Sequence, residues 1–107
     1  MKKPTKKPTK PAPKMKRASA KSPLTVGTAV LIRTVTHYLT GRVEAVGEHE
    51  ILLSSAAWIA DTGRYADALR TGTLSEVEPY PDGIVAVGRG AIVDAAIWPH
   101  ALPREQR

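Results

Sequence analysis

The sequence predicts a mainly β protein: a small, strongly bent barrel of five to six strands with one short inserted helix and a disordered N-terminal tail. Three observations predict it. β-Branched and other apolar residues gather in short segments separated by turn signals. A single stretch, 61–72, carries helix signals. Residues 1–23 are almost purely Lys, Pro, Thr, Ala and Ser, so we expect a tail over 1–23 and a barrel domain over 24–107.

The tail concentrates positive charge. Its prolines prevent a helix or a central strand, and its only large apolar side chains are Met1 and Met15. Burial therefore cannot offset the entropy of ordering, and we expect an extended, disordered arm. The arm has nine cations and no acid, and these are Lys2, Lys3, Lys6, Lys7, Lys10, Lys14, Lys16, Arg17 and Lys21.

Three strands are expected first in the barrel. Residues 28–35 (TAVLIRTV) are dense in β-branched side chains, and 38–46 (YLTGRVEAV) follow as a second strand. A polar turn over 47–50 leads into a third, apolar strand over 50–60.

A short helix follows within 61–72, with Asp61 or Thr62 as its N-cap and Gly72 just past its end. Residues 73–80 alternate imperfectly as a fourth strand, and the sequence PYPDG then makes a turn.

The segment VGRGAIVDAAIW predicts one bent strand or two, broken at Gly88-Arg89-Gly90. Glycine suits barrel corners, because a bend demands bulge or positive-φ geometry, and Gly41, Gly88 and Gly90 fall where corners are expected. Arg89 has two interpretations: a solvated corner residue, or a guanidinium that binds a phosphate or carboxylate. The final residues, 99–107, hold two prolines and are expected to form a surface strap.

Composition excludes several classes of function. The chain has no cysteine, which excludes disulfides and thiolate chemistry. No apolar run is long enough to cross a bilayer, and no apolar segment follows the basic N-terminus as in a secretory signal. Residues 24–107 carry seven arginines and all ten acids, a net charge of −3, which argues against nucleic-acid binding over a broad barrel face.

Two resemblances add to this reading. VLIRTVTHYLTGRVEAV and VGRGAIVDAAI resemble the two conserved segments of Sm-like and SH3-like small barrels. This resemblance implies a barrel in which the glycine segment faces the central pore of a ring. The helical insertion and the Lys/Pro tail depart from the Sm-like pattern.

The second resemblance is to a family of small tailed-bacteriophage proteins of uncharacterised function, and it implies an origin but no chemistry. The segments that carry it are IRTVTHYLTGRV, AAWIADTGRYADAL, GTLSEVEPYPDG and VGRGAIVDAAIW.

No catalytic constellation is present, so we expect neither an enzyme nor a cofactor or metal. His37, His49 and His100 lack metal-ligand spacing; the first two are expected on the surface, and His100 as a local cap or strap contact. Asp94 interrupts an apolar strand, and it is either an outward-facing residue or a buried carboxylate paired with an arginine.

Trp58 is expected in the core. Trp98, just before a proline, is expected to be half exposed at an interface, with Arg64 and Tyr65 on a further binding face. The strand GAIVDAAIW has few blocking charges at its edge, so self-association by edge pairing is expected.

Together these features favour a non-enzymatic phage accessory binding protein. In this hypothesis a homo-oligomeric barrel carries a cationic arm that contacts nucleic acid or another polyanion. We expect no contact with a membrane. The alternatives are a virion structural protein, such as a capsid cement or head component, and an arm that only improves solubility. The expected location is the bacterial host cytoplasm or the virion.

Overall fold

The computed structural model describes residues 22–107, so the prediction of a disordered tail lies almost entirely outside the described residues. These residues form six strands: β1 (Ala29–Thr34), β2 (Tyr38–Val46), β3 (Glu50–Asp61), β4 (Glu76–Pro79), β5 (Val85–Gly88) and β6 (Ile92–Ile97). They also form a helix, α1 (Tyr65–Thr71), and a 3₁₀ turn over Arg89–Ala91. The predicted fold class is confirmed.

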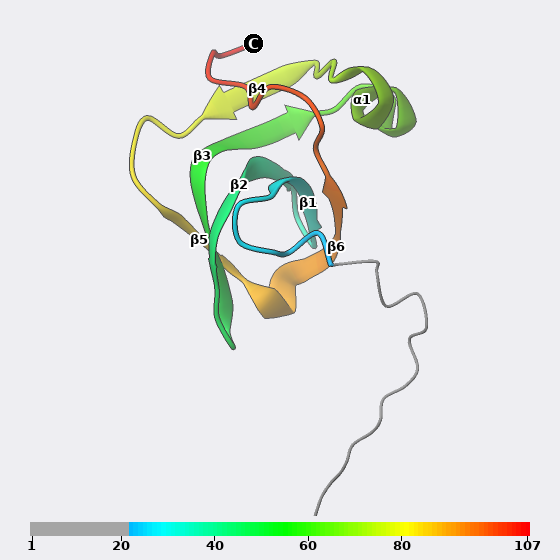
Figure 1. Cartoon of the computed structure of the whole chain (residues 1–107). Coiled ribbons are helices and arrows are strands. Elements are labelled where there is room, and N and C mark those ends of the chain that lie inside the picture. The colour runs from blue at the N-terminus through cyan, green and yellow to red at the C-terminus, as the bar shows by residue number, and fades with distance from the viewer. Residues whose placement is uncertain (1–21) are drawn as a thin grey trace, which may run out of the picture.

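The strands wrap into a bent antiparallel barrel (Figure 1). Their order is β4-β3-β2-β1-β6, and β5 pairs with the first half of β3. The second half of β3 pairs with β4 instead. Between the two halves, Ser55 has a φ of 49°, which is uncommon for a residue with a Cβ and marks the bend that lets one strand serve two partners.

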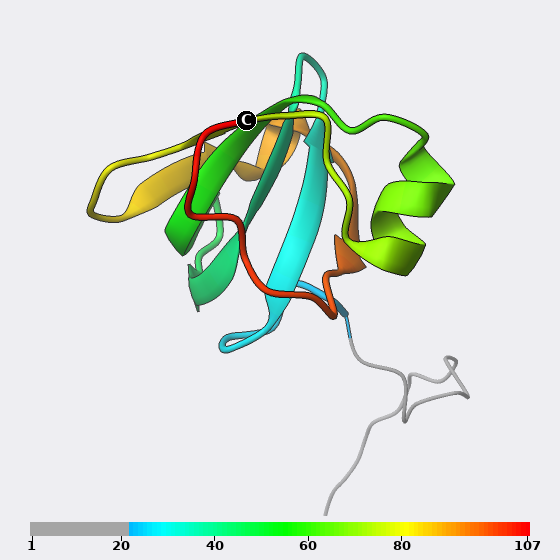
Figure 2. The same ribbon diagram turned by 90° about the horizontal axis from the view of Figure 1, so that it is seen from above.

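Two hydrophobic clusters hold the fold together. The first fills the barrel and comprises Val30, Ile32, Leu39, Val43, Ile51, Leu53, Ala56 and Val87. The second comprises Leu31, Ala57, Ile59, Ala68, Leu74, Val77 and Trp98. Side chains alternate between faces along a strand, so neighbours in β1 contribute to different clusters. Helix α1 flanks the barrel beside β6 and covers the second cluster with Ala68 (Figure 2).

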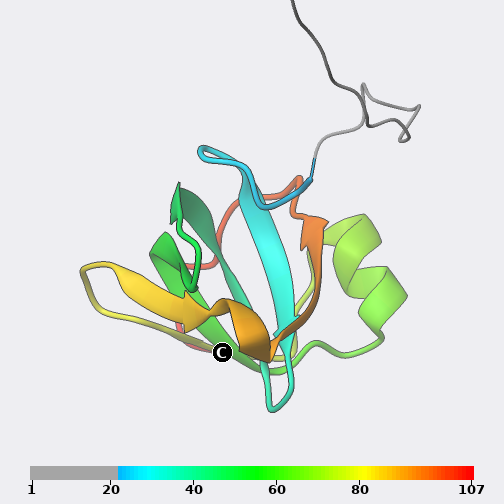
Figure 3. The same cartoon turned by 90° about the horizontal axis from the view of Figure 1, so that it is seen from below.

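The predicted corners occur, but glycine is required at only one of them. At Gly41 an added Cβ would lie 3.1 Å from the Cβ of Leu53, so glycine permits the close approach of β2 and β3 at a break in their register. The 3₁₀ turn joins β5 to β6 (Figure 3). Gly88 is the N-cap of this turn, and Gly90 lies within it. Neither has a positive φ, and an added Cβ would meet nothing within 4 Å. The geometric reason we expected for these two glycines is therefore wrong.

Helix α1 ends as predicted and begins differently. Gly72 is its left-handed C-cap, with φ 81°, and its N–H donates to the Ala68 carbonyl. Arg64 is the N-cap and makes no side-chain capping bond. Asp61, predicted as a cap, accepts instead from the Gly63 N–H at 2.8 Å, ahead of the helix. The predicted N-cap is wrong because Asp61 ends β3 and its carboxylate closes the following turn.

The C-terminal residues form the expected strap. Arg107 exchanges two backbone hydrogen bonds with Val77, at 3.0 and 3.1 Å, and so adds a bridge to the outer edge of β4. Arg104 donates to the carbonyls of Ala56 and Tyr80. The strap thus covers the outer edge of β4, which is the edge strand at this end of the sheet.

Candidate functional site

Arg89 lies at the turn between β5 and β6, with its guanidinium donating to the Gly47 carbonyl at 2.9 Å. Its side chain is otherwise exposed, and its role as an anion contact stays a prediction. The nine tail cations lie outside the described residues, so their joint position with Arg89 stays a prediction too.

The exposure of the two tryptophans is the reverse of what the sequence predicts. Trp98 is only 2% exposed, packs in the second cluster and donates its indole N–H to the Ala101 carbonyl at 3.2 Å. Trp58 is 42% exposed. The interface predicted at Trp98 is therefore wrong, because the strap and α1 cover its ring; Trp58 is the tryptophan available to a partner.

Arg64 is the N-cap of helix α1 and is exposed, and Tyr65 is its first residue and is partly buried. The Tyr65 ring lies 5.7 Å from the Tyr38 ring and 5.9 Å from the Arg33 guanidinium, measured to ring centroids. Burial, and secondarily the charge of Asp94, raise the pKa of Tyr65 above its ordinary value. Tyr65 therefore packs against the barrel, and its phenol stays neutral at physiological pH.

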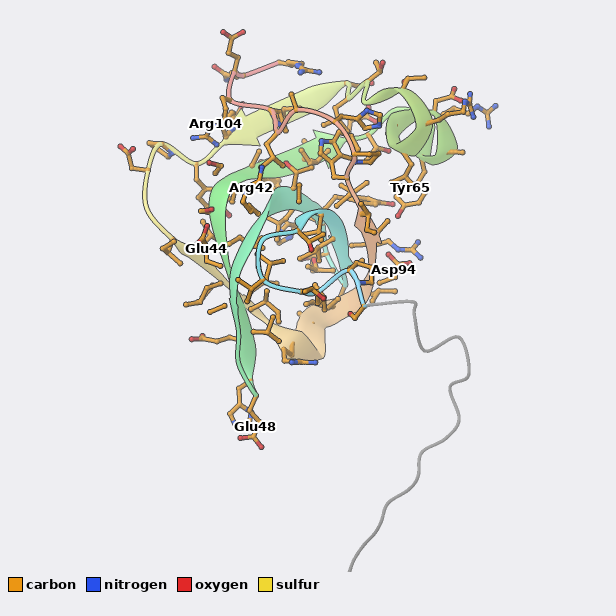
Figure 4. The ribbon with its side chains drawn as sticks, in the orientation of Figure 1. Arg42, Glu44, Glu48, Tyr65, Asp94 and Arg104 are labelled. Carbon is orange, nitrogen blue, oxygen red and sulfur yellow. The ribbon has the colours of Figure 1, made fainter. Side chains whose placement is uncertain are left out.

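Asp94 is partly exposed and is paired through one carboxylate oxygen, while its other oxygen, Oδ1, is buried without a hydrogen-bond partner. Its carboxylate accepts a hydrogen bond from Arg33 on the adjacent strand, and both side chains are about two-fifths exposed. This hydrogen bond, together with the negative charge of Asp94, raises the pKa of Arg33. Figure 4 places Asp94 and Tyr65 on the same flank, remote from Glu48 in the turn between β2 and β3. The flank is thus a compact structural cluster whose charges neutralise one another.

The mouth of the barrel carries a row of hollows that sequence reasoning missed. Trp58, Glu78 and Tyr80 line a hollow of about 230 Å³ with Pro79 and Pro81. A second, of about 310 Å³, lies between Trp58, Arg33 and the β1–β2 turn at His37. A third, of about 270 Å³, lies between Tyr80, His37 and β5. The sequence PYP indicates a turn, but nothing in it indicates that Pro79, Tyr80 and Pro81 also line a hollow.

Free backbone edges are the other feature that can bind a partner. Within residues 22–107, β6 pairs with β1 alone and β5 with β3 alone. The Trp98 N–H donates to the Ala29 carbonyl, so by alternation Ala95 and Ile97 direct their backbone groups to the open side of β6. The Ile97 side chain is 56% exposed there.

The described residues offer no arrangement for catalysis by metal. No group of three potential His, Cys, Asp or Glu ligands occurs in residues 22–107. His49 is exposed at a turn and His37 lines the mouth. His100 contacts the Leu69 carbonyl in α1 at 2.7 Å, which agrees with the strap contact that was one of its two expected roles. In the same part of the chain, no helix is long and apolar enough to cross a bilayer.

Comparisons with known proteins bear on the fold. No protein-family model matches the sequence, and no curated protein is significantly similar to it. Among solved structures, the chain is similar to a heptameric archaeal Sm protein, described with implications for the eukaryotic snRNP core. The TM-score is 0.50 and the identity 20%, and the match covers 69% of this chain and 90% of the Sm protein. The barrel therefore has an Sm-like fold.

Proposed function

We propose that this protein is a non-enzymatic binding protein that assembles through the free edges of β5 and β6 and contacts nucleic acid with its cationic N-terminal arm. The observation that carries the proposal is the separation of charge: nine cations precede residue 24, and a net charge of −3 follows. Each phosphate that the arm neutralises releases a counterion, so binding is independent of sequence and weakens steeply with salt.

Assembly is supported by the edges themselves. An unpaired strand edge is a template for another strand, and the two free edges lie at opposite ends of the sheet, with β6 beside β1 and β5 beside β3. A β5 edge of one copy pairing with a β6 edge of the next is a head-to-tail contact, which closes into a ring where the rotation permits. The similar archaeal Sm protein is heptameric, which agrees with this arrangement.

The resemblance to small tailed-bacteriophage proteins supports the finer proposal of a phage accessory protein acting in the host cytoplasm. The second candidate is a virion structural protein, with the barrel on the shell and the arm toward packaged DNA. Mass spectrometry of purified particles separates the two candidates, because a structural protein is present in stoichiometric amounts and an accessory protein is absent.

Assembly is tested by sedimentation of the native chain and of Ile97→Lys, which puts a charge on the free edge of β6. Val26→Lys is the matched control, because Val26 is 62% exposed and precedes β1. We expect oligomers for the native chain and the control, and monomers for Ile97→Lys. A native chain that is strictly monomeric at tens of micromolar overturns assembly.

Nucleic-acid binding is tested separately by gel shift. Replacement of the nine arm cations with glutamine is expected to abolish binding, and the native complex is expected to dissociate as salt increases. An unchanged shift in the substituted chain contradicts the role of the arm.

A further inference from the structure

We propose that the C-terminal strap and two prolines close the β4 half of one sheet edge, so that a second copy of this chain pairs only with the β5 half. This inference deepens the proposed function: it rests on assembly through free edges and says where along the sheet the contact forms. β2 pairs with β3 along one side, so β4 and β5 both lie on the other side of β3. We call the side of β4 and β5 that faces away from β3 the shared edge.

The backbone groups of β4 alternate between β3 and the shared edge. The Tyr80 N–H donates to the Ala56 carbonyl on β3 at 2.9 Å. By alternation, Val77 and Pro79 direct their backbone groups to the shared edge. The Val77 N–H agrees with this, because it donates to the Arg107 carbonyl in the strap at 3.1 Å.

Neither outward position of β4 offers a free N–H. Arg107 accepts from the Val77 N–H and donates to the Val77 carbonyl, as a residue of a paired strand does. Pro79 has no N–H, and Pro81, just beyond β4, has none either. An added strand needs donors along the edge that it joins, so β4 cannot extend the sheet.

Side chains oppose pairing at β4 as well. Glu76 and Glu78 are exposed on this four-residue strand, and charged residues on an edge disfavour an added strand. Arg104 donates to the carbonyls of Ala56 and Tyr80, at 3.2 and 3.1 Å, and so fixes the strap where β4 ends. Figure 1 shows the strap, in red, along β4, whereas β5 continues away from it.

β5 has the opposite properties. The Arg89 N–H donates to the His49 carbonyl next to β3, at 3.0 Å, so by alternation Ala86 and Gly88 direct their N–H groups to the shared edge. Both residues are exposed, and β5 has no charged side chain. Within residues 22–107, no strand pairs with β5 there. The free donors of the shared edge are therefore confined to β5.

The free edge of β6 in a second copy fits this short segment. Its outward residues, Ala95 and Ile97, are two positions apart, as Ala86 and Gly88 are on β5. Hydrogen-bonded residues of an antiparallel pair have this spacing on both strands. A shift of the pair along β4 finds no N–H group, so closure of β4 also restricts the register.

The test opens β4 in a chain whose β6 edge is blocked. Deleting residues 104–107 frees the Val77 N–H, and Pro79→Thr adds a second outward donor. Ile97→Lys in the same chain prevents pairing through β6. We expect Ile97→Lys alone to be monomeric in sedimentation, and the chain with β4 opened to associate roughly tenfold or more tightly.

Two substitutions at one position test the strap without a deletion. Arg107→Pro and Arg107→Ala both remove the guanidinium that donates to the Leu74 carbonyl at 3.3 Å, but only proline also removes the N–H that donates to Val77. We expect the Val77 amide to exchange with solvent roughly tenfold faster in Arg107→Pro than in Arg107→Ala. Equal exchange in the two variants overturns closure by the strap.

A control separates opened donors from exposed apolar surface. Pro4→Thr replaces Pro79→Thr in the chain that lacks 104–107 and carries Ile97→Lys, because Pro4 precedes the barrel domain. We expect this control to associate less than the chain with β4 opened. The proposal is overturned if the two associate equally, or if the opened chain sediments like Ile97→Lys alone. A monomeric native chain overturns assembly on β5 but leaves the closure of β4 standing, because the opened chain associates without β6.

Discussion

Replacing Gly72 with alanine tests how the C-terminal strap and helix α1 fit together. Gly72 has a φ of 81°, and an added Cβ would lie 2.8 Å from Cγ of His100. The His100 ring must therefore move, although its Nε2 lies 2.7 Å from the Leu69 carbonyl and its ring packs edge-on against Trp98 at 4.9 Å between centroids. The substitution affects backbone conformation and packing together.

The expected loss of unfolding free energy has three parts. A left-handed conformation costs a residue with a Cβ about 1 kcal/mol. Loss of the His100 hydrogen bond costs about 1 kcal/mol, and loss of the aromatic contact with Trp98 costs about 1 kcal/mol. We therefore expect Gly72→Ala to destabilise the protein by roughly 2–4 kcal/mol.

Two matched controls isolate the steric part. Gly83 has a φ of 87° with nothing within 4 Å of an added Cβ, so Gly83→Ala is expected to cost only about 1 kcal/mol. Gly90 has neither a positive φ nor a close neighbour, so Gly90→Ala is expected to stabilise by about 0.5 kcal/mol through the unfolded chain. Urea denaturation followed by circular dichroism, at one protein concentration, measures all three. Equal losses for Gly72→Ala and Gly83→Ala would refute the packing of His100 against Gly72.

Three further predictions concern side chains. Trp98→Ala is expected to cost about 3–5 kcal/mol in urea denaturation because its ring is 2% exposed, whereas Trp58→Ala is expected to cost less than about 1.5 kcal/mol; similar losses would contradict the assigned burial. A double-mutant cycle with Arg33→Ala and Asp94→Ala is expected to give a coupling below about 1 kcal/mol, because both side chains are partly exposed to solvent, and a larger value would indicate a buried pair. The raised pKa of Tyr65 means that its neutral form stabilises the fold fully below the ordinary tyrosine pKa, and that this contribution is lost as pH rises through the higher, folded value. The fall in stability over that alkaline range is expected to be shallower in Tyr65→Phe, as measured by urea denaturation at a series of pH values, and an unchanged slope would contradict it.

Local sequence signals determined most of the elements. β2 occupies the predicted residues, 38–46, because alternating side chains and flanking turns are properties of the segment itself. Gly72 ends α1 as predicted, because a left-handed cap is cheapest for glycine wherever the helix lies. The charge of the arm is likewise a property of composition alone.

Only the tertiary structure decided which tryptophan is available to a partner. The bend at Ser55 shifts the alternation of β3 by one residue, so Ala56 shares the barrel interior with Leu53 and Trp58 follows it to the mouth. Trp98 is covered by α1 and by the strap, which approach it from distant parts of the chain. The residues next to Trp58 and Trp98 in the sequence do not indicate the bend at Ser55 or the covering of Trp98. The burial of each indole depends on how the barrel closes and on which distant segments pack against it.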